Sequence, residues 1–466
     1  MKFLIFYLTF EFIFSKKLLF VLTHFRHGAR APLSLNKNNY DSFNQLWSNP
    51  GELTVVGQRM HYILGLHNHE KYIKEKKFLS ENYNPNEIYI LSTNHNRTIQ
   101  SALAQIQGLY YLNSSFNDIL NDNQKNISNP PINITQDIQK EIDKLNSVNS
   151  ALPQFLQTIP INIINHIEHE IIINDNSDCL DKIIENENII FESEMYVNIK
   201  QIFNDKYSKK FNKLLHEIGN YSIPYIIDLC DEYISDIYDG RDLNFLNNFD
   251  INLTDLEDYC LEISKIYSLI TLTNEKDNNL LYAMMTPFFR ELLYYMKKKI
   301  DMDINNITDD TNPKFVMFSG HDDSLGAMEI FLIKVFDIKD DNFFINPIFS
   351  SSCFFEVYKK DNITDKNNFD YSDYIIEYIF NDKLMKVWEF EEFYNIIHSH
   401  LWSKEQIFNY CEYNKEIIIE DPGKELKYII LILILIIFTL FGFNLHFCFK
   451  YLINDDSKLN KIVEDD

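Results

Sequence analysis

The sequence predicts an α/β protein with a mostly parallel central sheet flanked by helices and interrupted by an all-helical insertion. Residues Leu18–Phe25 form an almost wholly apolar run, which is typical of a strand buried on both faces of a parallel sheet. Two more short apolar runs, Glu87–Leu91 and Phe315–Phe318, also end abruptly in polar loops. Between these two runs, residues from about 178 to 266 show acidic helical segments without strand alternation.

The same patterns predict the remaining elements. Apolar residues recur at helical spacing from 53 to 64, behind the potential N-cap Thr54, and again from 99 to 109. A long helix is expected from about Asn279 to Ile300, and a shorter one over Tyr196–Ile218. Two further strands are expected at Phe354–Tyr358 and Tyr374–Phe380. Residues 113–150 are rich in Asn, Ser and Pro and predict loops.

Composition narrows the class of ligand. The chain has 466 residues, a net charge of -25 and a pI near 4.9, so no basic stripe is available for nucleic acid. Only six arginines occur, and two of them, Arg26 and Arg30, lie in one five-residue loop. Because lysine supplies nearly all other positive charge, this pair indicates a need for the planar guanidinium fork. A small anionic ligand is therefore expected.

A segment near each end of the chain has a pattern typical of proteins that are inserted into a membrane. Residues 1–15 carry Lys2, an apolar run and Ser15 as a small cleavage residue, the pattern of a signal peptide. Residues 428–448 form a run of 21 residues without a charge, long enough to span a bilayer. We therefore expect a single-pass type I membrane protein, its bulk luminal or extracellular and residues 449–466 a cytoplasmic tail.

Sequons and cysteines agree with an oxidising compartment. Eight Asn-x-Ser/Thr acceptors occur, at Asn96, Asn113, Asn126, Asn133, Asn220, Asn252, Asn306 and Asn362. Cys448 lies inside the long apolar run, which leaves five cysteines outside it: Cys179, Cys230, Cys260, Cys353 and Cys411. This odd number predicts two bridges and one thiol, and the wide spacing fits no zinc motif.

Polar side chains follow each of the first three apolar runs. The residues concerned are Arg26, His27, Arg30, Arg97, His321 and Asp322. Because ligands of open α/β sheets bind beyond the carboxyl ends of the strands, these side chains are expected to converge on one crevice. Guanidinium forks match phosphate oxygens, and a histidine between permanent cations is disfavoured in its charged form. Neutral imidazole is a nucleophile.

This set of residues indicates phosphoryl transfer. The arginines and His321 would hold the non-bridging phosphate oxygens, because positioning and charge compensation supply most of that catalysis. His27 would attack phosphorus and become a phosphohistidine. Asp322 would protonate the leaving oxygen and then take a proton from water. Since Asp322 must carry a proton when substrate arrives, an acidic working pH is expected.

The motifs resemble those of the histidine acid phosphatases, the second branch of the histidine phosphatase superfamily. The resemblance rests on Arg26-His27-Gly28-Ala29-Arg30-Ala31-Pro32 and the distant His321-Asp322. Leu53-Thr-x-x-Gly57 and Ser92-Thr-x-x-x-Arg97-Thr98 agree in order and spacing. It covers about Lys16 to Ile417 and is nearest to the prostatic and lysosomal acid phosphatase subgroup. It implies that His27 is the phosphorylated nucleophile, that Asp322 is the proton donor, and that Arg26, Arg30, Arg97 and His321 bind phosphate.

The resemblance also implies a domain plan. Residues 16–175 and 270–417 would form a discontinuous α/β phosphatase domain, and residues 176–269 an inserted helical cap. Disulfides Cys179–Cys411 and Cys230–Cys353 are implied, which leaves Cys260 as the free thiol. The resemblance suggests a homodimer, a phosphomonoester substrate, and a lysosomal, endosomal or cell-surface location. No cofactor or metal is expected.

Departures from the family pattern leave the substrate open. Leu91 stands where many members have arginine, Asn94 where they usually have aspartate, and Asp323-Ser324 where Thr-Thr is usual. A phytase-like or phosphoinositide phosphatase of the same fold is one alternative, and an inactive membrane-anchored binding protein is another. A metalloenzyme is disfavoured because the pairs His67/His69, His166/His169 and His398/His400 lack nearby Cys or a His-Glu-x-x-His frame. No Gly-rich nucleotide loop is present, which excludes a kinase or ATPase.

Overall fold

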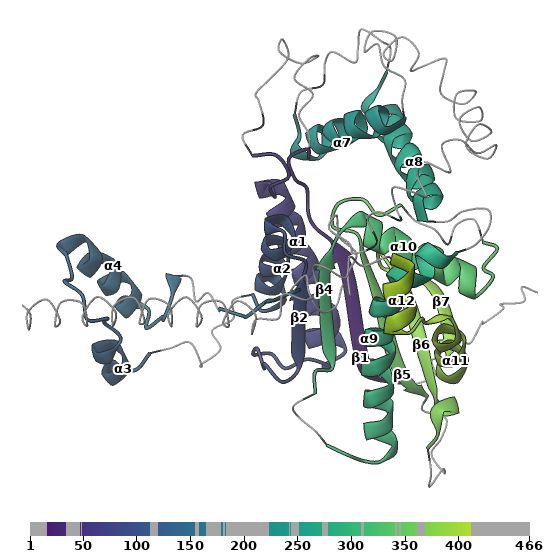
Figure 1. The fold of residues 1–466 in the computed structure, drawn as a ribbon. Helices are drawn as coiled ribbons and strands as arrows, with labels where there is room; N and C mark the ends of the chain where they lie inside the picture. The colour runs from purple at the N-terminus through teal and green to yellow at the C-terminus, as the bar shows by residue number, and fades with distance from the viewer. Residues whose placement is uncertain are drawn as a thin grey trace, which may run out of the picture. The chain divides into compact units, whose positions relative to one another are not determined.

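The protein is seen here in a computed structural model that describes most of its central part. The described residues are 16–33, 47, 49–111, 120–153, 158–164, 179, 182, 223–241, 243, 251–272, 278–308, 312–340, 343, 346–360 and 369–411. They form a mixed α/β fold in which a seven-stranded sheet lies between layers of helices (Figure 1).

The sheet changes character at its central strand. Its order is β3-β2-β4-β1-β5-β6-β7. The parallel strands are β1 (Lys16–Arg26), β2 (Ile88–Ser92), β3 (Asn162–Ile163) and β4 (Phe315–Gly320). The antiparallel strands are β5 (Ser352–Lys360), β6 (Tyr374–Phe380) and β7 (Lys383–Glu389). The expectation of a mostly parallel sheet is therefore wrong for one half, since three of the six strand pairings are antiparallel.

Strand β1 contacts a helical layer on each face, which confirms that it is buried on both. Val21 and Phe25 belong to an apolar cluster that includes Ile106 of α2 (Asn96–Leu109). The alternate residues Phe20 and His24 contact rings of α9 (Asn279–Ile304). This alternation is what a strand at the centre of a three-layer fold requires.

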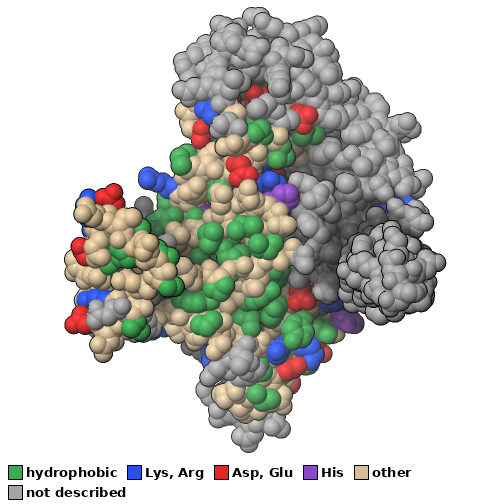
Figure 2. All heavy atoms as spheres, turned by 60° about the vertical axis from the view of Figure 1, so that its left-hand side comes forward, with side chains coloured by type: hydrophobic (Ala, Val, Ile, Leu, Met, Phe, Trp, Pro, Cys, Tyr) green, Lys and Arg blue, Asp and Glu red, His purple; other side chains and the backbone are tan. Residues whose placement is uncertain are grey.

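Helices α1 and α2 pack closely against each other. Helix α1 (Val55–Asn68) has Thr54 as its N-cap, as predicted. It continues into a π-helical segment, η1 (His69–Glu75). A Cβ on Gly65 would lie 2.0 Å from Gln105 O, so only glycine allows this approach. Figure 2 turns the side that carries these helices forward and shows hydrophobic side chains gathered on it. The exposed ones on the two helices include Val55, Tyr62, Ile63 and Leu103.

Three more helices contact α9: α10 (Asp322–Val335), α11 (Phe390–His400) and α12 (Lys404–Cys411). Residues 113–150 were expected to be loops, but α3 (Asp122–Ile127) and α4 (Gln136–Ser147) form there. Side-chain caps and ion pairs three residues apart, such as Lys140–Asp137, support these helices, and a count of Asn, Ser and Pro does not detect them.

Strand β7 was also missed. It follows a tight turn in which Asn381 and Asp382 adopt positive φ angles of 44° and 62°, as in a type I′ hairpin. Most of its side chains are exposed and several are charged, which is usual for an edge strand. The apolar pattern that predicts interior strands is therefore absent here.

Helices α7 (Ile223–Asp239) and α8 (Leu253–Leu272) form a pair with an apolar cluster of its own. In Figure 1 this pair lies above the sheet, beyond the ends of its strands. It falls within the predicted insertion 176–269, except that α8 runs a few residues further. The predicted helix Tyr196–Ile218, the signal peptide 1–15 and the anchor 428–448 lie outside the described residues. Among the helices that are described, none is long and apolar enough to cross a membrane.

The disulfides differ from the implied pairing at one bridge. Cys179 is joined to Cys411, as implied, but Cys230 is joined to Cys260 and not to Cys353. Cys230 and Cys260 lie on facing helices with Cα atoms 5.1 Å apart, a usual separation for a bridge. Cys353 is a free, buried thiol in β5, opposite His24 of β1. Cys230 thus lies in the α7–α8 pair and Cys353 in the sheet, so the implied Cys230–Cys353 pairing is wrong.

We predict that Cys260→Ala destabilises the protein far more than Cys353→Ala. The Cys230–Cys260 bridge closes a loop of 30 residues. Loss of such a loop closure lowers the free energy of unfolding by roughly 3–4 kcal/mol. Truncation of the free thiol removes only local packing, worth about 1 kcal/mol. Denaturant unfolding of both variants measures the difference, and equal losses would contradict the assigned pairing.

Candidate active site

The three polar loops meet at one edge of the sheet, as predicted. Strands β1, β2 and β4 are parallel, and their last residues are in register: Arg26 lies opposite Gly320, and Ser92 opposite Ser319. His27 N donates to Gly320 O at 3.0 Å, and Thr93 N donates to Ser319 O at 3.1 Å. The residues that follow these strands are therefore neighbours.

A close backbone contact sets the turn after β1. A Cβ on Gly28 would lie 2.4 Å from Gly57 O, so the turn reaches α1 only because both residues are glycine. Thr54 Oγ1 donates to Ala29 O and accepts from Gly57 N, at 3.0 and 3.1 Å. The segment Leu53-Thr-x-x-Gly57 thus supports the arginine–histidine loop, which explains why the two motifs occur together.

His27 is buried and neutral at the centre of the site. Its Nδ1 lies 2.9 Å from Gly28 O, and because a carbonyl only accepts, the ring proton is on Nδ1 and the lone pair on Nε2. Burial lowers the pKa of His27 well below its ordinary value, and the charges of Arg26 and Arg30 lower this pKa further. The imidazole therefore stays unprotonated at Nε2, the form that a nucleophile needs.

His321 faces His27 from the N-terminus of α10. The ring centroids are 5.5 Å apart, in an edge-on arrangement. His321 Nε2 lies 3.0 Å from Thr93 Oγ1, and Arg97 Nη2 lies 3.5 Å from His321 Nδ1. Burial, then the charge of Arg97, lowers the pKa of His321 well below its usual range. This brings Arg97, from the second strand's loop, to the same centre.

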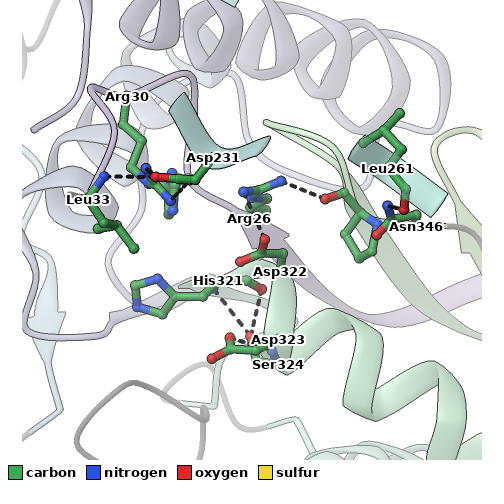
Figure 3. A network of polar contacts seen from close by, with 12 residues as sticks. Arg26, Arg30, Leu33, Asp231, Leu261, His321, Asp322, Asp323, Ser324 and Asn346 are labelled. Carbon is green, nitrogen blue, oxygen red and sulfur yellow. Dashed lines mark hydrogen bonds and ion pairs between the residues drawn. The ribbon is translucent and has the colours of Figure 1, made fainter. Parts of the chain in front are cut away.

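Arg26 and Arg30 lie beside His27, each held at the end of its guanidinium group. Arg26 Nη1 donates to Pro347 O and Nη2 pairs with Asp322 Oδ2, both at 2.8 Å. Arg30 Nη1 and Nη2 donate to the two carboxylate oxygens of Asp231, at 3.1 and 2.7 Å (Figure 3). Both Nε atoms are buried without a hydrogen-bond partner in the described part of the chain. A buried N–H without an acceptor is costly, so these two groups fit an anionic ligand.

All six predicted site residues are thus brought together, but two partners were missed. Asp231 comes from α7, which carried no motif. The other is the segment 346–351 before β5, where Phe349 packs its ring 4.3 Å from the Arg26 guanidinium carbon. Because β5 is antiparallel to β1, this segment precedes a strand and still reaches the carboxyl edge of β1. A search restricted to residues that follow parallel strands cannot find it.

Two more buried histidines make hydrogen bonds that hold these loops. His61 Nε2 lies 3.1 Å from Arg26 O, and its Nδ1 pairs with the side-chain amide of Gln105 at 3.0 Å. His24 Nε2 lies 2.8 Å from Ser324 Oγ, which in turn accepts from His321 N at 3.3 Å. Burial lowers the pKa of both His24 and His61 to about 4.

His67 and His398, each from one of the paired histidines of the sequence, make contacts outside this site. His67 Nε2 pairs with Asp382 Oδ1 at 2.9 Å, and His398 stacks on Tyr394. The pair His166/His169 lies outside the described residues. Within the described ranges, no group of three or more His, Cys, Asp or Glu side chains is arranged to hold a metal ion.

A profile of the histidine phosphatase superfamily, branch 2, matches residues 17–381. The chain belongs to this family. The match includes both halves of the site, from the loop after β1 to His321 and Asp322 at the start of α10. The family match therefore includes all six predicted site residues.

Curated relatives match over a shorter stretch. The chain is 38% identical over 96 residues to a lysosomal acid phosphatase of Xenopus laevis, covering 21% of this chain and 22% of the relative. It is 33% identical over 108 residues to a prostatic acid phosphatase of Homo sapiens, covering 23% of this chain and 27% of the relative. The matches thus span about a quarter of the relatives' length.

Solved structures with the same fold match over nearly their whole length. The phytase of Klebsiella sp. ASR1 superposes with a TM-score of 0.53 at 11% identity, covering 84% of this chain and 98% of that one. The phytase of Citrobacter braakii gives a TM-score of 0.51 at 12% identity, covering 84% and 99%. At this identity the likeness shows the fold and not the substrate.

We predict that His61→Gln flattens the pH dependence of stability. In the unfolded chain His61 regains a pKa of about 6.5, whereas in the folded protein it is about 4. Between these values the unfolded state binds a proton that the folded state does not, so stability falls as the pH falls from 6.5 to 4. The loss is roughly 3 kcal/mol for this histidine over that interval, and none is added above or below it.

Denaturant unfolding at pH 6.5 and pH 4 tests this prediction. The variant should lose less stability between the two pH values than the wild type does. Because glutamine can still donate to Arg26 O, the fold should be retained at pH 6.5. Equal losses in the two proteins would show that His61 takes up its proton in the folded state.

Proposed function

We propose that this protein is an acid phosphatase that hydrolyses phosphate monoesters through a covalent phosphohistidine on His27. The observation that carries the proposal is a neutral, buried His27 between two arginines whose Nε–H groups have no acceptor among the described residues. A phosphate group supplies both an electrophile for Nε2 and oxygen acceptors for the arginines.

In the first half-reaction, His27 Nε2 forms a bond to phosphorus as the bond from phosphorus to the ester oxygen breaks. Arg26, Arg30, Arg97 and His321 hold the non-bridging oxygens, where charge must be compensated. Asp322 gives its proton to the leaving oxygen. Its side chain suits this role because it is 39% exposed and so can meet a leaving group, whereas Arg26 beside it is buried.

In the second half-reaction, water attacks the phosphohistidine and the bond from phosphorus to nitrogen breaks. Asp322, now a carboxylate, takes the proton from the attacking water, which returns it to its starting form. Phosphate leaves, and His27 regains its lone pair. Because Asp322 must start protonated, turnover should be fastest at acidic pH.

The cellular location is proposed from the disulfides and from the predicted signal peptide and membrane anchor. Bridges such as Cys179–Cys411 form in oxidising compartments. With the predicted signal peptide 1–15 and anchor 428–448, this supports a luminal or extracellular enzyme on one membrane span. The named lysosomal and prostatic relatives are consistent with a lysosomal or secreted route.

We predict that the purified full-length chain hydrolyses p-nitrophenyl phosphate between pH 4 and 7 with a chelator present. His27→Ala should abolish turnover because it removes the nitrogen that bonds to phosphorus in the proposed mechanism. Asp322→Ala should lower kcat by about 10²–10⁴, the usual contribution of a general acid. Initial rates measured at several pH values test all three statements.

The same assay separates the alternatives. Comparison of p-nitrophenyl phosphate with inositol hexakisphosphate and a phosphoinositide would show whether specificity is broad or phytase-like. If folded wild-type protein binds phosphate without turnover at any pH, the proposed enzymatic activity is contradicted and a membrane-anchored binding protein is favoured. Full activity in His27→Ala would contradict the covalent mechanism.

A further inference from the structure

Asp231 of α7 binds the segment that follows β1 through both carboxylate oxygens. Its Oδ1 accepts from Arg30 Nη2 at 2.7 Å, and its Oδ2 accepts from Arg30 Nη1 at 3.1 Å and from Leu33 N at 2.8 Å (Figure 3). The Arg30 side chain is 5% exposed and that of Asp231 21%. Paired bonds between a guanidinium and a carboxylate fix geometry as well as supplying energy.

The bridge uses only one edge of the guanidinium group. A guanidinium carries five N–H donors in one plane, so it offers an end, formed by Nη1 and Nη2, and a side, formed by Nε and Nη2. Asp231 occupies the end, and Arg30 Nη1 also donates to Ala31 O at 3.0 Å. Arg30 Nε is buried and has no hydrogen-bond partner among the described residues. The Nε–H group on the side edge is therefore a donor that the described residues leave without an acceptor.

Arg26 shows the same division. The two nitrogens at its end pair with Pro347 O and Asp322 Oδ2, and its Nε is likewise buried without a partner in the described ranges. Both arginines that flank His27 are thus held at the end of the guanidinium group, with Nε unused. Arg30 differs in that its holder comes from the α7–α8 pair.

Helix α7 is itself held firmly where Asp231 projects. Cys230, the preceding residue, is bridged to Cys260 of α8. Trp47 Nε1 donates to Asp236 Oδ1 at 3.0 Å, and the Tyr238 ring packs edge-on to Phe349 at 5.3 Å. From α8, Leu261 O accepts from Asn346 Nδ2 at 2.6 Å. The helix that carries Asp231 is therefore fixed by a disulfide and by side-chain contacts, as a positioning group requires.

We propose that Asp231 is a positioning residue for phosphate: it holds the end of Arg30 so that the Nε–Nη2 side faces the bound oxyanion. The inference rests on the proposed function, and Asp231 itself does not touch substrate. The rival arrangement is a carboxylate that blocks Arg30 and leaves when phosphate binds. The third bond, to Leu33 N, and the unused side edge favour positioning, because a blocking group needs neither.

The test compares Asp231→Asn with Asp228→Asn in the full-length protein. Asp228 is exposed on the same helix and carries the same charge, so its variant controls for the loss of one negative charge. Titration calorimetry measures the Kd of inorganic phosphate without requiring turnover. Rates with p-nitrophenyl phosphate give KM and kcat, and thermal unfolding checks the fold.

We expect Asp231→Asn to weaken phosphate binding and raise KM by about tenfold, equivalent to ~1.4 kcal/mol. Because Arg30 holds phosphate in both the ground state and the transition state, kcat should change by less than about threefold. Asp228→Asn should leave Kd and KM within about twofold, the scatter expected for a surface substitution. Asp231→Glu should recover part of the affinity, since it restores the carboxylate on a longer side chain.

Two results would overturn the inference while leaving the proposed function intact. Tighter phosphate binding in Asp231→Asn than in Asp228→Asn would show that the carboxylate blocks Arg30. Equal affinities in the two variants, with an active wild type, would show that the bridge does not position Arg30. A wild-type protein that neither binds phosphate nor turns over would instead overturn the proposed function together with the inference.

Discussion

Two guanidinium groups, those of Arg26 and Arg30, are buried at the end of one strand, and neither can lose its proton in a protein. Charge in such a place is stable only when acceptors surround it. Asp322 and the Pro347 carbonyl supply them for Arg26, and Asp231 and the Ala31 carbonyl for Arg30. The same two charges, added to burial, keep the imidazole of His27 neutral. The bonds that hold the two arginines and the neutral state of His27 thus have one origin.

The fold brings these acceptors from distant parts of the chain to one edge of the sheet. Asp322 opens α10 after the parallel strand β4, whereas Pro347 precedes the antiparallel strand β5. Both reach the end of β1 because β1 is the strand at which the sheet changes from parallel to antiparallel. Asp231 arrives from outside the sheet, on α7. A purely parallel sheet would have placed the segment before β5 at the opposite edge.

The parts of this arrangement that were predictable are those with a local signal. Apolar runs mark β1, β2 and β4. The residues that follow these runs, including His27 and His321, are of types that the sequence alone marks as candidates for a site. The direction of β5 has no such signal, because an apolar run looks the same for a parallel and an antiparallel strand. The sequence therefore did not predict that Phe349, which precedes β5, lies at the site. Asp231 and the Cys230–Cys260 bridge depend on how α7 and α8 pack, which hydrophobic periodicity does not specify.

The proposed mechanism requires that His27 forms a covalent bond to phosphorus. We would incubate the wild type and Asp322→Asn with p-nitrophenyl phosphate, quench in alkali to preserve phosphohistidine, and map the peptides by mass spectrometry. We predict one phosphoryl group on the peptide that contains His27, located on His27 itself. More of it should accumulate in Asp322→Asn, because hydrolysis of the intermediate is slowed. Turnover by the wild type with the phosphoryl group on another residue, or on none in either protein, would contradict it.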